Sequence, residues 1–97
     1  MEIEKAFEEY KKIKIQEGYP EHLVDRSILF AKHYLDTITG FLDGRHPNLV
    51  ERAKKEMLPE ALSFAERWIA GIYGLAGKKA EVHPETFWEE KIKTIVG

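Results

Sequence analysis

The sequence contains no cysteine, which excludes disulfide bonds, thiol catalysis and cysteine-ligated zinc. Side-chain amides are almost as rare, because Gln16 and Asn48 are the only two in 97 residues. The longest nearly apolar stretch covers residues 68–77, far short of the roughly 20 residues that a membrane-spanning helix needs. The first residues are acidic and amphipathic, whereas a secretory signal begins with a basic region and a long apolar run. We therefore expect no membrane span and a cytoplasmic location.

The composition itself is that of a folded chain, with 43% hydrophobic and 33% charged residues. A chain of this length can bury a sizeable core without a disulfide or metal, so we expect a single helical domain over residues 1–97. Charge that comes mainly from Glu and Lys, with few amides, is typical of a protein from a thermophile. The formal net charge of −2 does not favour a polyanionic partner.

Apolar residues recur at helical spacing along most of the chain, and no segment alternates with the period of a strand. The segments expected to be helical are 2–16, 20–43, 47–58, 58–76 and 84–96. This pattern predicts an all-α fold, a bundle of four to five antiparallel helices joined by short loops.

Glycine and proline mark the expected boundaries of these helices. Gly18 and Gly77 are suited to ending helices, and Pro20 and Pro84 to opening them. Pro59 lacks an amide donor and crowds the preceding turn, so a break or a kink is expected there. Whether residues 48–76 form one kinked helix or two is left open.

The segment 58–76 has an unusually wide apolar face, which extends from Phe64 through Leu58 to Tyr73. Its other side is made of small residues, namely Ser63, Ala70, Gly71 and Gly74. Such a helix can be the central helix of the monomer, or it can be covered by a second copy in a homodimer.

Reactive side chains align on the polar side of the second helix, where Asp25 lies beside the row His22, Arg26, His33 and Asp36. His22 with Asp25, and His33 with Asp36, have the spacing at which side chains on a helix can touch. A carboxylate beside an imidazole can prepare it for acid–base chemistry or metal binding. On so charged a helix the same pairs are also ordinary solvated surface, which is the interpretation we favour.

Other constellations are poor matches to known sites, so we expect no metal and no cofactor. Diiron bundles use Glu-x-x-His pairs, which are absent, and the pair Asp43 and His46 falls in an expected loop. His83 precedes a proline and is not expected to join a ligand cluster. The lysines are mixed with Glu and are interpreted as solvated; they include Lys11, Lys12, Lys14, Lys54, Lys55, Lys78 and Lys79.

The segment from Glu17-Gly18-Tyr19 through Arg26-Ser27 to His33 resembles the HEPN superfamily, with the resemblance confined to residues 2–40. That family consists of small helical bundles in which an Arg followed several residues later by His marks the ribonuclease members. The resemblance implies a ribonuclease or nucleotide-binding dimer with Arg26 and His33 as catalytic residues. The resemblance also leads us to expect a polar residue next to the Arg, and the only such residue after Arg26 is Ser27.

The sequence therefore favours a small helical interaction or scaffold domain that self-associates, without enzymatic activity and without a nucleic-acid partner. The alternative is the HEPN-like dimer that uses Arg26 and His33. Burial separates the two hypotheses, because a catalytic pair should line a shared cleft.

Overall fold

A computed structural model describes residues 2–40, 47–78 and 82–96 of the chain. These residues form four helices and no strand, which confirms the all-α prediction. The helices are α1 (Glu2–Gln16), α2 (Glu21–Thr39), α3 (Pro47–Leu75) and α4 (Glu85–Val96).

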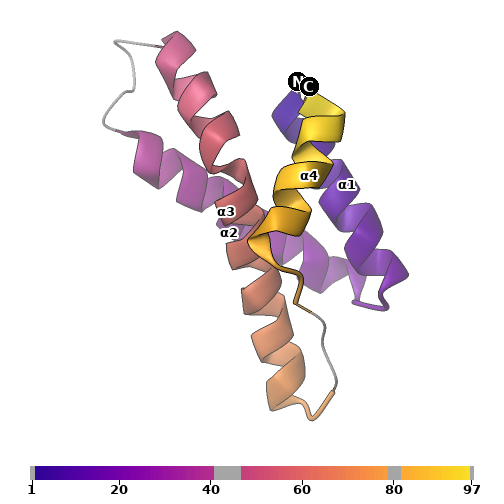
Figure 1. Cartoon of the computed structure of the whole chain (residues 1–97). Coiled ribbons are helices and arrows are strands. Elements are labelled where there is room, and N and C mark those ends of the chain that lie inside the picture. Colours follow the sequence, from indigo (N-terminus) through magenta and orange to yellow (C-terminus); the bar gives the residue numbers. More distant parts are fainter. Residues whose placement is uncertain (1, 41–46, 79–81, 97) are drawn as a thin grey trace.

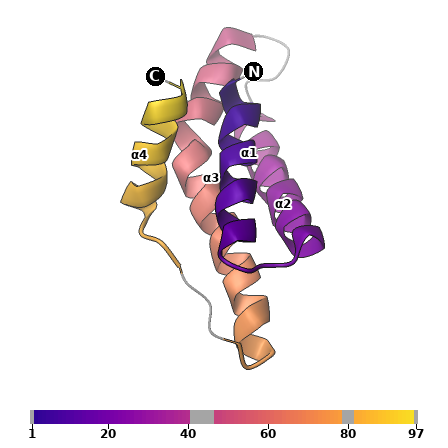
Figure 2. The ribbon, with the colours of Figure 1, turned by 90° about the vertical axis from the view of Figure 1, so that its right-hand side faces the viewer.

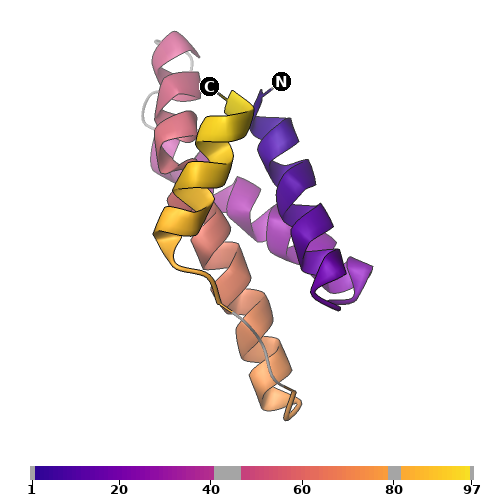
Figure 3. The same ribbon diagram turned by 45° about the vertical axis from the view of Figure 1, so that its right-hand side comes forward.

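The chain reverses direction at each connection, so that the start of α1 and the end of α4 lie at the same end of the bundle (Figure 1). The long helix α3 packs against all three other helices. Its C-terminal part extends beyond them, as the views in Figures 2 and 3 also show. No helix among the described residues is long and apolar enough to cross a membrane.

Most of the expected boundaries are confirmed. Gly18 and Gly77 adopt positive φ angles of 98° and 75°, a conformation that glycine reaches without strain. The amide of Tyr19 then donates to the carbonyl of Lys14, and the amide of Lys78 donates to that of Tyr73, which completes the last turns of α1 and α3.

One boundary prediction differs from the structure, and of the break or kink expected at Pro59 the structure excludes the break. The α-helical conformation of α2 ends at Thr39, before the expected end at Asp43, and residues 41–46 with the Asp43/His46 pair lie outside the described residues. Pro59 does not interrupt α3, which is continuous over 29 residues. The neighbouring side chains of Leu58 and Leu62 are fully buried, and this packing offsets the roughly 3 kcal/mol that a proline costs inside a helix.

The core explains the wide apolar face predicted for the segment 58–76. Its central residues are buried within the chain itself, namely Leu58, Ala61, Leu62, Ala65 and Ile69. They pack with residues of the other three helices, including Phe7, Leu35 and Trp88. Intramolecular packing therefore covers most of this face, although not Phe64.

Candidate functional site

The two residues singled out by the HEPN resemblance, Arg26 and His33, are both exposed on α2. They lie on the same side of the helix, separated by roughly 10 Å along its axis. No ion pair within the described segments joins either side chain to another. In the isolated chain these two residues are therefore not brought together in a shared buried site.

The two His-x-x-Asp pairs of α2 are also exposed, as expected for solvated residues. Each aspartate pairs with a lysine from another helix instead of with its histidine. Asp25 lies 2.9 Å from Lys11 of α1, and Asp36 lies 2.9 Å from Lys54 of α3. These carboxylates thus connect helices at the surface.

Lys14 contradicts the prediction that the lysines of α1 are solvated, because its side chain is completely buried. The apolar residues Ile3, Phe7 and Tyr10 follow one another at spacings of four and three, and Lys14 continues the same row after four more residues. The helix therefore directs its ammonium group into the core. Glu66 is likewise a charged residue in an apolar row, since it falls between the buried residues Leu62 and Ile69 on the inner face of α3.

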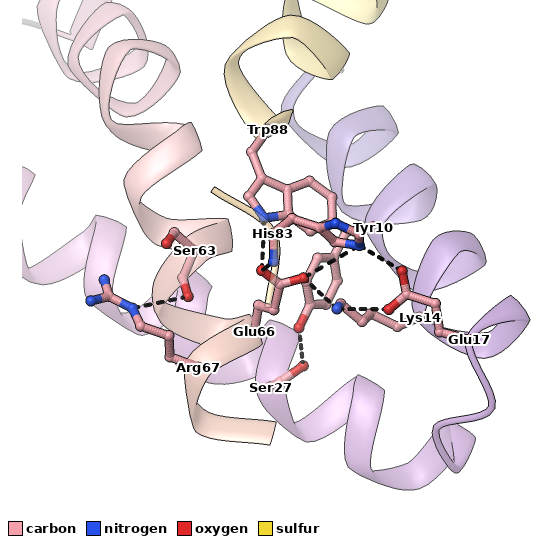
Figure 4. Close-up of polar contacts among 9 residues, drawn as sticks. All are labelled: Tyr10, Lys14, Glu17, Ser27, Ser63, Glu66, Arg67, His83 and Trp88. Carbon is pink, nitrogen blue, oxygen red and sulfur yellow. Dashed lines mark hydrogen bonds and ion pairs between the residues drawn. The ribbon is translucent and has the colours of Figure 1, made fainter. Parts of the chain in front are cut away.

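Glu66 is the centre of a buried polar network that joins α1, α3 and the segment before α4 (Figure 4). Its Oε2 atom accepts a hydrogen bond from Nζ of Lys14. Its Oε1 atom accepts hydrogen bonds from the backbone amide of His83, at 2.7 Å, and from Nε1 of Trp88, at 3.3 Å. Both oxygens are satisfied, as a buried carboxylate requires.

Glu17 and His83 close the network on its partly exposed side. Nζ of Lys14 donates to Glu17 Oε1 at 2.9 Å, and Nε2 of His83 lies 2.7 Å from Glu17 Oε2. Partial burial acts to raise the pKa of Glu17, but the hydrogen bonds from His83 and Lys14 outweigh it and lower that pKa. Glu17 therefore stays ionised and holds the segment before α4 against the end of α1.

Aromatic rings surround the buried ammonium group. Nζ of Lys14 lies 5.1 Å from the ring centre of Tyr19 and 5.9 Å from that of Trp88, distances typical of cation–π contacts. Tyr10 stacks at an angle on Trp88 and forms a 3.0 Å hydrogen bond with Ser27 of α2. Burial raises the pKa of Tyr10 well above its ordinary value, so its hydroxyl stays protonated.

The network includes ligand types that bind metals, which corrects the expectation that His83 joins no such cluster. Ligand atoms of Glu17, Glu66 and His83 all lie within 4.8 Å of one another. Carboxylate and imidazole groups are common zinc ligands. However, the ammonium group of Lys14 contacts both carboxylates and supplies the positive charge of the cluster. The arrangement therefore serves to hold three segments together with an internal cation.

A second feature lies on the opposite side of α3 from Glu66. Phe64, Trp68, Gly71 and Leu75 form a row that we call the α3 stripe. Phe64 is 43% exposed and Leu75 is 92% exposed, while Trp68 is half-buried. On α2, Tyr34 stacks on Phe64 and Phe30 packs against Trp68, so the stripe borders the α2–α3 seam. It is an apolar surface that the described part of the chain leaves open.

The small residues predicted to admit a neighbouring helix differ in their burial. Ser63 is buried, whereas Gly71 and Gly74 are exposed. A methyl group built onto either glycine meets no atom within 4 Å, and neither glycine has a positive φ angle. The fold of the described chain therefore does not itself require glycine at these two positions.

Comparison with protein-family models, with curated proteins and with solved structures found no match to this chain. Its function is therefore inferred from the side chains described above.

Proposed function

We propose that this chain is a small, non-enzymatic helical interaction domain that self-associates as a homodimer through the α3 stripe. The observation that carries the proposal is the exposure of Phe64 and Leu75 in one row with Trp68 and Gly71. Intervals of four, three and four residues are those at which helices pack against each other in coiled coils and bundles. A row of this kind normally faces another helix.

Single exposed apolar residues are common on protein surfaces and need no partner. Ile15, Leu29, Leu49 and Val82 are exposed in this way. The α3 stripe differs from them because its members follow one helix face over three turns and continue into the half-exposed ring of Phe30. This continuity supports a docking surface.

Replacing Leu75 by Glu should convert the dimer to a monomer, because it places a charge in the apolar contact. The folded chain itself should be unaffected, since Leu75 is 92% exposed. Light scattering coupled to gel filtration gives the mass, and circular dichroism checks the helix content. Ile15→Glu is the matched control, because Ile15 is 41% exposed on α1, the helix that contacts Glu66 on the other side of α3, and it should remain dimeric. Equal masses for the two variants would argue against the stripe.

A second candidate function is the HEPN-like ribonuclease or nucleotide-binding dimer that uses Arg26 and His33. The observation in its favour is that both residues are exposed on the side of α2 that also carries Phe30. Phe30 packs against Trp68 of the α3 stripe. Association through the stripe would bring this side of α2 close to the partner, where two copies of the pair could act on one phosphate.

An RNA cleavage assay with the purified protein separates the two candidates. The interaction domain should leave a single-stranded RNA intact, with or without Arg26→Ala and His33→Ala. Cleavage that disappears in the double variant, with no change in melting temperature, would replace the interaction domain by the ribonuclease. Cleavage that persists in the double variant would indicate a contaminating nuclease.

A further inference from the structure

We infer that the α3 stripe pairs with the same stripe of a second copy in antiparallel orientation. The two-fold axis crosses the interface midway along the stripe, at the level of residues 69 and 70. This inference rests on the proposed self-association and specifies its geometry. The intervals along Phe64, Trp68, Gly71 and Leu75 are four, three and four residues. This series of intervals reads the same from either end. In an antiparallel pair, each stripe residue of one copy therefore lies opposite a stripe residue of the other.

The sizes of the facing side chains are complementary in this register. Trp68, the largest member, faces the partner's Gly71, and Phe64 faces the partner's Leu75. Two-fold symmetry repeats both contacts, so each bulky ring of one copy has a matching position on the other. A parallel pairing would instead place Trp68 against the partner's Trp68 and leave a void between the two copies of Gly71.

The glycines provide an independent reason for a close approach from outside. Glycine inside a helix destabilises it by about 1 kcal/mol relative to alanine. Gly71 and Gly74 lie inside α3 with nothing within 4 Å of the position of a Cβ atom. In the antiparallel register the indole ring of the partner's Trp68 packs over Gly71. Gly74 lies opposite the partner's Arg67, so no two like charges face each other along this edge of the interface.

Cysteine cross-linking tests the register, and the chain has no cysteine of its own to interfere. We expect a disulfide when Phe64→Cys and Leu75→Cys chains are mixed and mildly oxidised, because the two positions face each other. Neither variant alone should cross-link, since identical positions are offset by about 16 Å along the helices. A disulfide requires Cα atoms within about 7 Å.

The outcomes of this experiment distinguish the register from the self-association itself. Disulfides within either single variant would mean parallel pairing and would overturn the inference. A wild-type dimer with no cross-link in the mixture would overturn the register and leave the proposed function intact. A wild-type monomer would overturn both.

A second set of variants tests the same register without removing Phe64 or Leu75. Gly71→Leu should dissociate the dimer, because the added side chain meets the partner's Trp68, whereas a Cβ atom at this position has open space around it in the chain itself. Adding Trp68→Ala should restore the dimer by making room for that leucine, with circular dichroism as the check on folding. A Gly71→Leu variant that stays dimeric would contradict the inference.

Discussion

Lys14→Met should lower the free energy of unfolding by about 3–5 kcal/mol, the usual cost of removing one partner of a buried ion pair. Lys14 and Glu66 are both completely buried, so the substitution leaves the Glu66 carboxylate in the core without its counter-ion. Urea unfolding followed by circular dichroism at neutral pH measures the loss. Lys12→Met on the exposed face of α1 is the matched control, and it should change the stability by less than about 0.5 kcal/mol.

Adding Glu66→Gln to Lys14→Met should recover a large part of this loss. The amide is neutral, and its oxygen can still accept the hydrogen bonds from the His83 amide and the Trp88 indole. A double variant as unstable as the single one would show that the cost comes from packing around the lysine stem. A Lys14→Met variant as stable as the control would contradict the buried network altogether.

Leu35→Ala should destabilise the fold by about 2–5 kcal/mol, because it removes a buried side chain and leaves a cavity. Leu35 is only 2% exposed, and it belongs to the apolar core between α2 and the other helices. For a chain of this size the melting temperature should fall by roughly 4–8 °C for each kcal/mol.

The combined change Arg26→Ala and His33→Ala lies on the same helix and provides the contrast. Both residues are exposed, so the melting temperature should change by no more than that of an ordinary surface variant. All variants must be compared at one protein concentration, because association of the folded state raises the apparent stability. Unfolding of the double variant would mean that this side of α2 is buried in the assembly.

Local signals in the sequence predicted the helices well. The glycines that end α1 and α3 and the prolines that precede α2 and α4 act within one or two turns, so their effect can be read without the tertiary structure. Pro59 shows the limit of such reasoning. Its local effect favours a break or a kink, and whether the helix breaks depends on tertiary packing, here the burial of Leu58 and Leu62 in a continuous α3.

The polar network could not be predicted from composition, because Lys14 and Glu66 are 52 positions apart and each resembles many exposed neighbours. One signal was present in the sequence. Each residue occupies a position where the helical period of its segment calls for an apolar side chain, and the two charges are opposite. A charge in an apolar row therefore indicates a buried partner elsewhere in the chain.

The functional hypotheses differ in how much support the fold gives them. Arg26 and His33 are placed on one side of α2, as the helical period predicted, but their approach to a shared phosphate depends on a second copy. The wide face of α3 was anticipated from its apolar residues. Which part of it the chain covers depended on how α1, α2 and α4 pack, and among the described residues of this face Phe64 and Leu75 stay exposed.

The most direct test of this account is the mass of the wild-type protein in solution. Light scattering coupled to gel filtration, over a range of concentrations up to high micromolar, should give twice the 11.3 kDa of one chain. The mass should fall toward that of one chain on dilution if the association is weak. A mass of 11.3 kDa at every concentration would contradict self-association through the α3 stripe.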